Sequence, residues 1–249
     1  MVSRAKLILF LLIFFLPLRC AFAGPPFETD DPEPTDYKHW EIYASSGYEY
    51  SGINGKSYSL PELEADYGLL PNVQLSVNIL NELNLPPSHL QEAHYGYGDS
   101  EIGMKYRFIQ ETGIIPEVAI FPSVLIPTGN NNEGLGSGRS DTFLPVWVEK
   151  NVGSWRAYGG AGYWFNPGIG NKNWVFSGLA IEHDLDKHIT LGGEFFHRTA
   201  DTYDDKGSSG FNLGFTYNIN KRYHILFSAG RDLDGPRKFT SYLAFEISF

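Results

Sequence analysis

The sequence has one cysteine in 249 residues and, after its first two dozen positions, no stretch that approaches the roughly 18 apolar residues of a membrane-spanning helix. A helical membrane protein is therefore excluded. Basic residues are also few, with 19 Lys and Arg against 29 Asp and Glu, so nucleic acid is not an expected partner. No internal repeat longer than a hairpin interrupts the chain, which predicts one domain.

The first residues read as a secretory signal peptide, predicted over residues 1–23. Arg4 and Lys6 precede an apolar run from Leu7 to Leu18, and Ala21-Phe22-Ala23 follows as a small-residue cleavage site. We predict cleavage between Ala23 and Gly24. Acylation of Cys20 is the weaker interpretation, because the bulky Arg19 stands where a lipoprotein signal has small residues.

Cleavage at this site leaves a mature chain without cysteine, so no disulfide can stabilise it. It also removes three basic residues and no acidic one, which leaves 16 basic and 29 acidic residues and a net charge of −13. The mature chain starts with residues 24–38, which are rich in proline and acid and lack strand periodicity. We expect a periplasmic tail, and two alternatives stay open: it hangs loosely or it tucks into the mouth of the fold that follows.

Residues 39–249 alternate between apolar and polar side chains with a period of two, which predicts β-strands. At the carboxyl end, Leu243, Phe245, Ile247 and Phe249 share one face, and Tyr242, Ala244, Glu246 and Ser248 share the other. The alternation predicts twelve strands, roughly at 39–50, 59–69, 73–83, 96–108, 114–127, 140–150, 155–165, 174–184, 187–198, 209–218, 222–231 and 239–249. Most are 10 to 13 residues long, as a tilted membrane-crossing strand requires.

The connections between these strands alternate between long and short. Short turns and long loops on opposite sides are typical of an outer-membrane barrel, with the turns in the periplasm and the loops outside. The sequence therefore predicts an all-β, antiparallel up-and-down transmembrane β-barrel of twelve strands, with both termini in the periplasm. A soluble β-sandwich is the alternative, but it gives no reason for the alternation. The predicted external segments are 51–58, 84–95, 128–139, 166–173, 199–208 and 232–238.

Aromatic residues make up 15% of the chain and gather at the predicted strand ends, where amphipathic rings sit at the lipid headgroups. The alternative is that aromatic residues simply favour strands. The predicted girdles contain Trp40, Phe108, Trp155, Tyr217, Tyr223 and Phe249 on the periplasmic side, and Tyr50, Tyr97, Trp164, Phe165, Trp174 and Phe239 on the outer side.

The alternation also assigns charged residues to the barrel interior, because a charge facing lipid costs about 2–4 kcal/mol at the midplane for Arg or Lys. These charges either line a polar pore or form a salt-bridged plug. The alternation assigns fifteen charged residues to the interior, and eleven of them are acidic, which predicts a weak cation preference. The predicted pore-lining residues are Glu62, Glu64, Asp66, Glu101, Lys105, Arg107, Arg156, Glu182, Glu194, Arg198 and Glu246. The four others are Glu41, Glu49, Glu149 and Asp184.

Three other patterns could carry chemistry. Asp30, Asp31 and Glu33 could bind a hard cation, but a solvated acidic turn is the preferred interpretation. The glycine-rich segment 127–139 lacks the Gly-Lys-Ser/Thr ending of a phosphate-binding loop. A hydrolytic or lipid-modifying centre would need His183, His197, His224, Glu194 and Ser228 to converge, and the predicted faces separate them. We therefore predict no catalytic, metal-binding or cofactor-binding residues.

Five short segments carry a resemblance to a known family. They are Pro26-Phe27-Glu28-Thr29-Asp30-Asp31-Pro32, His39-Trp40-Glu41, Pro127-Thr128-Gly129, Leu144-Pro145-Val146-Trp147 and Tyr158-Gly159-Gly160-Ala161-Gly162-Tyr163-Trp164. With them the chain resembles the outer-membrane transporter family named for the meta-pathway of phenol degradation. The resemblance implies a barrel in the Gram-negative outer membrane that takes up small compounds, with aromatic ones among the candidates.

We therefore expect a channel or passive transporter for small solutes, surrounded by outer-membrane lipid, and not an enzyme. The alternatives are a lipid-modifying or hydrolytic barrel and a structural barrel without transport. Phe249 ends an alternating strand, and the likeness to other outer-membrane proteins implies that the barrel-assembly machinery reads it. An interfacial aromatic residue without that role is the other interpretation.

Overall fold

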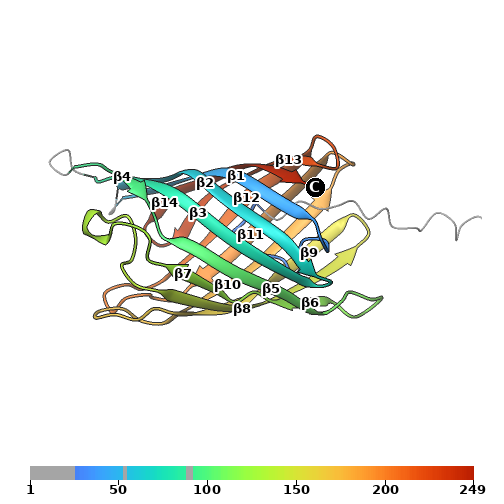
Figure 1. Cartoon of the computed structure of the whole chain (residues 1–249), viewed down its shortest axis with the longest axis horizontal. Helices are drawn as coiled ribbons and strands as arrows, with labels where there is room; N and C mark the ends of the chain where they lie inside the picture. Colours follow the sequence, from blue (N-terminus) through green and yellow to red (C-terminus); the bar gives the residue numbers. More distant parts are fainter. Residues whose placement is uncertain (1–25, 53–54, 88–91) are drawn as a thin grey trace, which may run out of the picture.

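A closed antiparallel β-barrel forms most of the chain in the computed structural model, which describes residues 26–52, 55–87 and 92–249 (Figure 1). The strands are β1 (Trp40–Ser51), β2 (Gly55–Leu70), β3 (Val73–Leu85), β4 (His94–Tyr97), β5 (Ser100–Ile109), β6 (Glu117–Ile120), β7 (Ser123–Ile126), β8 (Asp141–Val152), β9 (Trp155–Phe165), β10 (Trp174–Asp184), β11 (Ile189–Arg198), β12 (Ser208–Asn218), β13 (Tyr223–Asp234) and β14 (Arg237–Ser248). One short 3₁₀ helix, η1 (Asn131–Glu133), lies in a loop.

The fourteen segments form twelve barrel strands, because two of these strands are each interrupted once. β4 and β5 both pair with β3 and are separated at Gly98-Asp99, while β6 and β7 both pair with β5 and β8 and are separated at Phe121-Pro122. Pro122 has no N–H to donate to a neighbouring strand, which explains the second break. Its carbonyl still accepts a hydrogen bond from the Met104 N–H at 3.0 Å.

The barrel closes where the first strand meets the last. β1 pairs with β14 from Glu41 opposite Ser248 to Ser51 opposite Arg237. At the very end of this seam the Trp40 N–H donates to the Phe249 carbonyl at 2.8 Å, and the Phe249 N–H donates to the Trp40 carbonyl at 3.0 Å. Apart from the short β4, which pairs with β3 alone, each described strand has a partner on both sides, which confirms the predicted twelve-stranded antiparallel barrel.

Outward and inward faces differ as the alternation predicts. Along β12, for example, Leu213 is 62% exposed, whereas its neighbour Asn212 is 3% exposed and faces the lumen. Apolar exposed side chains cover the outside of every long strand, and most side chains on the inside are polar or small, apart from two buried apolar clusters. An apolar outer surface around a polar interior is the arrangement that lipid requires. Among the described residues no helix is long and apolar enough to cross a membrane.

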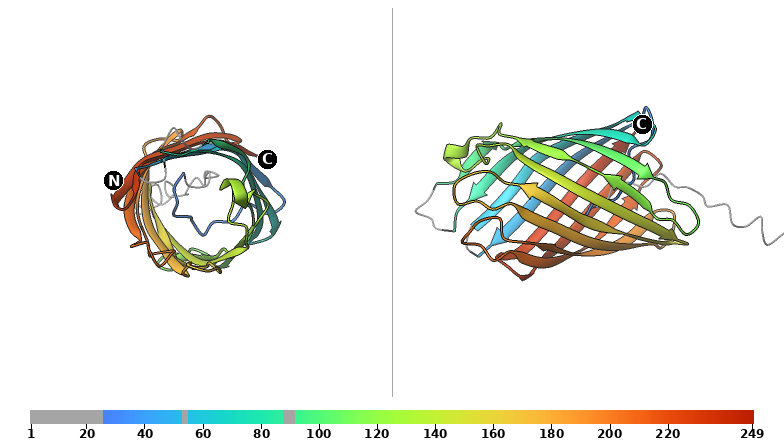
Figure 2. Two further views of the ribbon diagram at one scale, coloured as in Figure 1. Left: turned by 90° about the vertical axis from the view of Figure 1, so that its left-hand side faces the viewer. Right: turned by 90° about the horizontal axis from the view of Figure 1, so that it is seen from below.

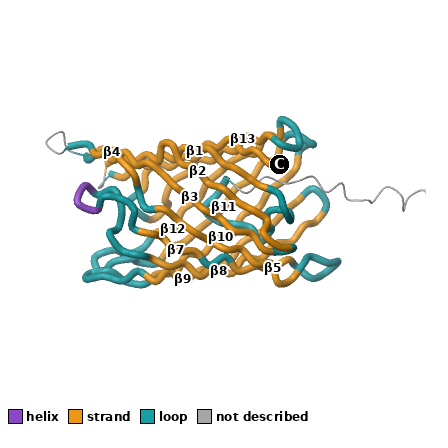
Figure 3. Tube along the Cα trace, viewed as in Figure 1, coloured by secondary structure: helices purple, strands orange, loops and turns teal. Residues whose placement is uncertain are grey.

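The connections differ at the two ends of the barrel. The turn end, which also holds the carboxyl terminus, has segments 71–72, 110–116, 153–154, 185–188 and 219–222, and the loop end has segments 52–54, 86–93, 127–140, 166–173, 199–207 and 235–236. Figure 3 shows η1 and most of the long loops gathered at the loop end. Two predicted long loops, 51–58 and 232–238, are wrong: the strands continue, and these connections are as short as the turns.

The described part of the amino-terminal segment lies inside the barrel. Figure 2 shows it within the ring of strands, and Pro26, Thr29, Asp31 and Thr35 are buried there. Between the two alternatives for residues 24–38, the structure thus places the described residues inside rather than hanging loosely below. We call residues 26–36 the plug. Residues 1–25, with the predicted signal peptide and its Ala23–Gly24 cleavage site, lie outside the described residues.

Candidate functional site: a polar lumen with a docked plug

The plug crosses the lumen and bonds with strands all around it. Near the loop end, the Glu28 carboxylate bridges two guanidinium groups, with 2.7 Å to Arg198 Nη2 and 2.7 Å to Arg237 Nη1. Arg237 is buried and also pairs with Asp232 at 3.0 Å through Nε. Charge-assisted, partly desolvated bonds of this kind are roughly twice as strong as neutral ones. Glu28 is therefore a strong anchor for the upper part of the plug.

Glu194, from β11, binds the plug backbone directly. Its carboxylate accepts hydrogen bonds from the Glu28 N–H at 2.9 Å, the Thr29 N–H at 2.9 Å and the Thr29 hydroxyl at 2.6 Å. Asn212 on the neighbouring strand donates a fourth bond at 2.7 Å. Glu194 is only 2% exposed, so these four donors replace the water that it loses. The backbone of Glu28 and Thr29 is thereby fixed against this wall.

A third group of contacts lies nearer the turn end. Lys105 Nζ is 3.1 Å from Asp30 Oδ1 and 3.5 Å from Asp31 Oδ1. Arg156 Nη1 reaches Asp31 Oδ2 at 3.4 Å, and its Nη2 binds Glu182 at 2.6 Å. Asp30 and Asp31, considered above as cation ligands, are therefore ion-paired with lumenal bases. Below them the Thr35 N–H donates to Gln74 at 2.8 Å and its hydroxyl to Glu41 at 2.9 Å.

Small residues make room for the plug on the wall formed by β10 and β11. A Cβ atom at Gly178 would lie 1.9 Å from the Thr29 hydroxyl oxygen, which no side chain could tolerate. A Cβ at Gly192 would lie 2.9 Å from the Phe27 ring. The glycines therefore form a shallow groove in the wall that fits the shape of the plug. The charges of the wall also match those of the plug.

The eleven predicted pore-lining residues all lie on the inward face, but they fall into three sets. Arg107 pairs with Glu117 at 3.1 Å near the turn end. The set that binds the plug or its partners is Lys105, Arg156, Glu182, Glu194 and Arg198. The set for which the described residues provide no ion pair is Glu62, Glu64, Asp66, Glu101 and Glu246, which we call the acidic wall.

The acidic wall has no basic partner among the ion pairs of the described residues. Glu62 accepts a bond from Asn78 Nδ2 at 2.7 Å, and Glu246 from the Ser248 hydroxyl at 2.8 Å. One carboxylate oxygen of Asp66 and one of Glu246 is buried without a hydrogen-bond partner in the described chain. Buried carboxylate oxygens need donors or cations, so this wall attracts water and positive charge.

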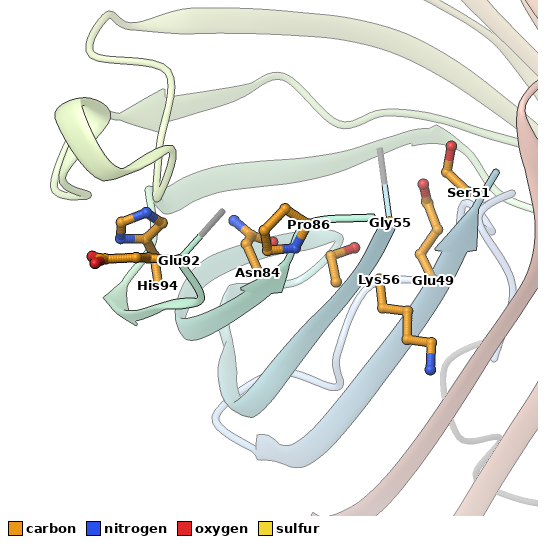
Figure 4. A pocket seen from close by; sticks show the side chains of 9 residues that line it. Glu49, Ser51, Gly55, Lys56, Asn84, Pro86, Glu92 and His94 are labelled. Carbon is orange, nitrogen blue, oxygen red and sulfur yellow. The ribbon is translucent and has the colours of Figure 1, made fainter. Parts of the chain in front are cut away.

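Above the plug, three cavities open toward the loop end and share Glu49 in their linings. They have volumes of about 690, 450 and 500 Å³. We call them together the vestibule. Figure 4 shows the largest, with Glu49, Asn84 and His94 around it. The lumen is therefore hollow above the plug, and the plug occupies part of it at the level of Glu28.

Sequence reasoning missed Arg237 and Asp232, because it assigned 232–238 to an external loop. The signal was Asp234-Gly235, a pair typical of two-residue hairpin turns, and Gly235 does adopt a positive φ of 155°. The girdle assignment of Trp164 and Trp174 is also wrong. Both face the lumen, where their rings stack at 5.3 Å, whereas the other ten predicted girdle residues are exposed on the outside.

The residues considered for catalysis do not converge. His183 stacks on Trp155 with ring centroids 4.2 Å apart, and His197 bonds with Ser209 at 2.9 Å, both on the outer face. His224 faces inward but bonds with Asn218, while the Ser228 hydroxyl donates to the Pro26 carbonyl of the plug. Glu194 is fully engaged with the plug. None of these groups activates another.

Residues 45–245 match the family model described as "Putative MetA-pathway of phenol degradation". The chain belongs to this family. No curated protein matches the chain. The resemblance predicted from the short segments is thereby confirmed.

Solved structures share the fold of this family member. The COG4313 outer membrane channel from Pseudomonas putida F1 is similar with a TM-score of 0.66 and 17% identity over 87% of this chain and 99% of that one. The KdgM porin in complex with disordered oligogalacturonate has a TM-score of 0.57 and 12% identity, over 83% and 99% of the two chains. The NanC porin has a TM-score of 0.55 and 9% identity, over 83% and 98%. The fold is thus that of outer-membrane channels and porins.

Proposed function

We propose that this protein is an outer-membrane channel for small solutes and that its lumen favours cations. The observation that carries the proposal is the division of lumenal charge. Lys105, Arg107, Arg156, Arg198 and Arg237 each form an ion pair with an acid, whereas the acidic wall has no basic partner among the described residues. Rows of unpaired carboxylates favour cations, and charges in a narrow lumen are weakly screened.

Family membership and the porin-like fold support transport rather than catalysis. The family description refers to phenol degradation, and the KdgM porin structure holds an oligogalacturonate, so both descriptions refer to organic compounds. A lipid-modifying enzyme is disfavoured because the histidines, Ser228 and Glu194 are each engaged elsewhere. A structural barrel without transport gives no reason for a hollow vestibule above the plug.

The test is the reversal potential of the purified barrel in a planar bilayer with a salt gradient. We expect the sign of cation selectivity, reduced when Glu62→Gln and Glu101→Gln are combined, because two unpaired lumenal charges are then lost. Glu133→Gln, in the loop that carries η1, is the matched control and should leave the potential unchanged. A reversal potential with the sign of anion selectivity would refute the proposal, as would the absence of any conductance.

We infer that the loop end faces the cell exterior and the turn end the periplasm, since long loops of outer-membrane barrels lie outside. The native chain has no cysteine after Cys20, so single cysteines can be placed without background. A cysteine at Asn131 or Asp204 should react with an impermeant reagent on intact cells, and one at Asn72 should not. Labelling of Asn72 with protection of Asn131 would reverse the orientation.

We also propose that Phe249 is read by the barrel-assembly machinery, after export directed by residues 1–23 and cleavage between Ala23 and Gly24. The Phe249 ring is 54% exposed on the outside, while its backbone bonds with Trp40 complete the seam. Deleting Phe249 should lower the amount of heat-modifiable barrel in the outer membrane, whereas Phe249→Tyr should preserve it. Normal assembly of the deletion variant would reject the role.

A further inference from the structure

Seven aromatic side chains pack against one another inside the barrel, on the inward face between β6 and β11. They are Phe121, Phe143, Trp147, Trp164, Trp174, Phe176 and Phe196. We call them the aromatic ladder. Its upper part is built of parallel rings: Trp174 stacks on Trp164 at 5.3 Å and 9°, and Trp164 on Phe143 at 4.6 Å and 15°. A contiguous aromatic surface is unusual in a lumen that is otherwise polar.

The lower rings of the aromatic ladder are buried, and the uppermost ring is partly exposed. Phe196 is 3% exposed and Trp147 is 1% exposed, so these rings are structural packing. Trp174, at the beginning of β10, is only half-buried and borders the vestibule cavity of about 500 Å³. An indole face left against a water-filled cavity gains free energy when a second flat apolar group covers it.

The charges around Trp174 are mostly negative. The same cavity is lined by Glu49, Asp201, Asp204, Asp205 and Asp232, and by the bases Arg198 and Arg237. Both guanidinium groups already bind Glu28, and Arg237 also binds Asp232 at 3.0 Å and lies 3.9 Å from Glu49. Arg237 lies over the Phe196 ring at 4.9 Å and Arg198 at 5.7 Å, on the buried side of the ladder.

The three aspartates of the loop 199–207 have no basic partner among the ion pairs of the described residues. The nearby Lys172 ammonium lies over the Tyr203 ring at 5.8 Å, and its residue's N–H donates to the Asp201 carbonyl rather than to a carboxylate. A solute at Trp174 therefore meets a flat apolar face on one side and unpaired carboxylates on the other. That combination attracts a ring with a positive charge and repels a ring with a negative one.

We propose that Trp174 and the surrounding acids form a binding subsite for single-ring aromatic cations. The aromatic ring stacks on the exposed face of Trp174, and the ammonium group points toward Glu49 and Asp201. The subsite deepens the channel function proposed above by naming a substrate class, but binding itself does not require conduction. Neutral phenols bind there more weakly, and aromatic carboxylates bind most weakly of the three.

The experiment is isothermal titration calorimetry of benzylammonium into the full mature chain, refolded in lipid nanodiscs. Trp174→Ala should lower the affinity about fivefold or more, which is the loss expected for one stacked cation–aromatic contact. Trp174→Phe should keep most of the affinity, because an aromatic face remains. Trp155→Ala is the matched control, because Trp155 is 54% exposed on the lipid side. Any effect of this variant would reflect partitioning of benzylammonium into lipid and not binding in the lumen.

A second arm separates charge from stacking. Glu49→Gln should weaken benzylammonium about fivefold and leave phenol unchanged, and wild-type protein should bind benzoate more weakly than either. Heat modifiability on gels confirms that each variant is folded. Equal affinity of Trp174→Ala and wild type, or benzoate binding as tight as benzylammonium, would overturn the subsite. If the wild-type protein conducts cations but does not bind benzylammonium, the subsite alone is rejected. If it binds benzylammonium but does not conduct, the channel proposal is rejected.

Discussion

The wall of β9–β13 and the acidic wall face each other across one lumen, yet they use charge in opposite ways. On the β9–β13 side, two arginines form ion pairs with the plug, Arg156 with Asp31 and Arg198 with Glu28. Glu194 accepts hydrogen bonds from the plug backbone, and Gly178 leaves room for the plug. On the acidic wall, Glu62, Glu64 and Glu101 are half-buried and form no ion pair with a base of the described chain. Paired charges hold a segment in place, and unpaired charges act on whatever passes.

The strongest test of this comparison removes the plug. Deleting residues 26–35 should raise the single-channel conductance severalfold, because the level of Glu28 and Asp31 is then empty and twelve strands enclose a continuous path. Planar-bilayer recordings measure the change. The control is Glu133→Gln, in the loop that carries η1 and outside both the plug and the subsite at Trp174. Unchanged conductance after the deletion would mean that the plug does not obstruct the path.

The next test concerns stability. Arg156→Met should cost about 3–5 kcal/mol of unfolding free energy, because the buried Glu182 then loses its ion-pair partner and Asp31 keeps only Lys105. Glu62→Gln, on the acidic wall, should change stability by no more than about 0.5 kcal/mol. Urea unfolding in lipid vesicles compares the two variants. Equal losses would erase the distinction between the walls.

The smallest expected effect comes from the shape of the plug's seat. Gly178→Ala should displace Thr29 and raise conductance, but by less than the deletion, since the Glu28 and Asp31 pairs remain. Adding Thr29→Gly should restore part of the wild-type conductance, because the clash involves the threonine side chain. Gly113→Ala is the control, at a position with open space around it. Failure of the second substitution to compensate would show that Gly178 acts otherwise.

Most of the barrel could be predicted from the sequence, because a lipid-exposed strand imposes a period of two that local residues reveal by themselves. The strand from Trp155 to Phe165 matches its predicted bounds, for example. Errors arose where a local rule was not applied to the end of a strand. Trp164 and Phe165 are adjacent and cannot share a face, so the alternation already excluded one of them from the girdle.

The plug could not be placed from the sequence for a different reason. Its segment has no periodicity, and its partners lie far along the chain, with Glu28 bonded to Arg237 and Pro26 to Ser228. Only the closed barrel brings those residues together. The sequence predicted that the inward charges existed and that acids outnumbered bases. It could not show which of them would be used by the plug.

The long separation between the plug and its partners has a consequence for the order of folding. Glu28 and Arg237 are 209 residues apart, and Pro26 and Ser228 are 202 apart. Pro26 and Glu28 thus complete these contacts only after the last two strands, β13 and β14, are in place. We therefore expect the plug to dock late in folding. Until then the amino-terminal segment should be accessible to a protease. The time at which cleavage of this segment stops would therefore show when the barrel closes.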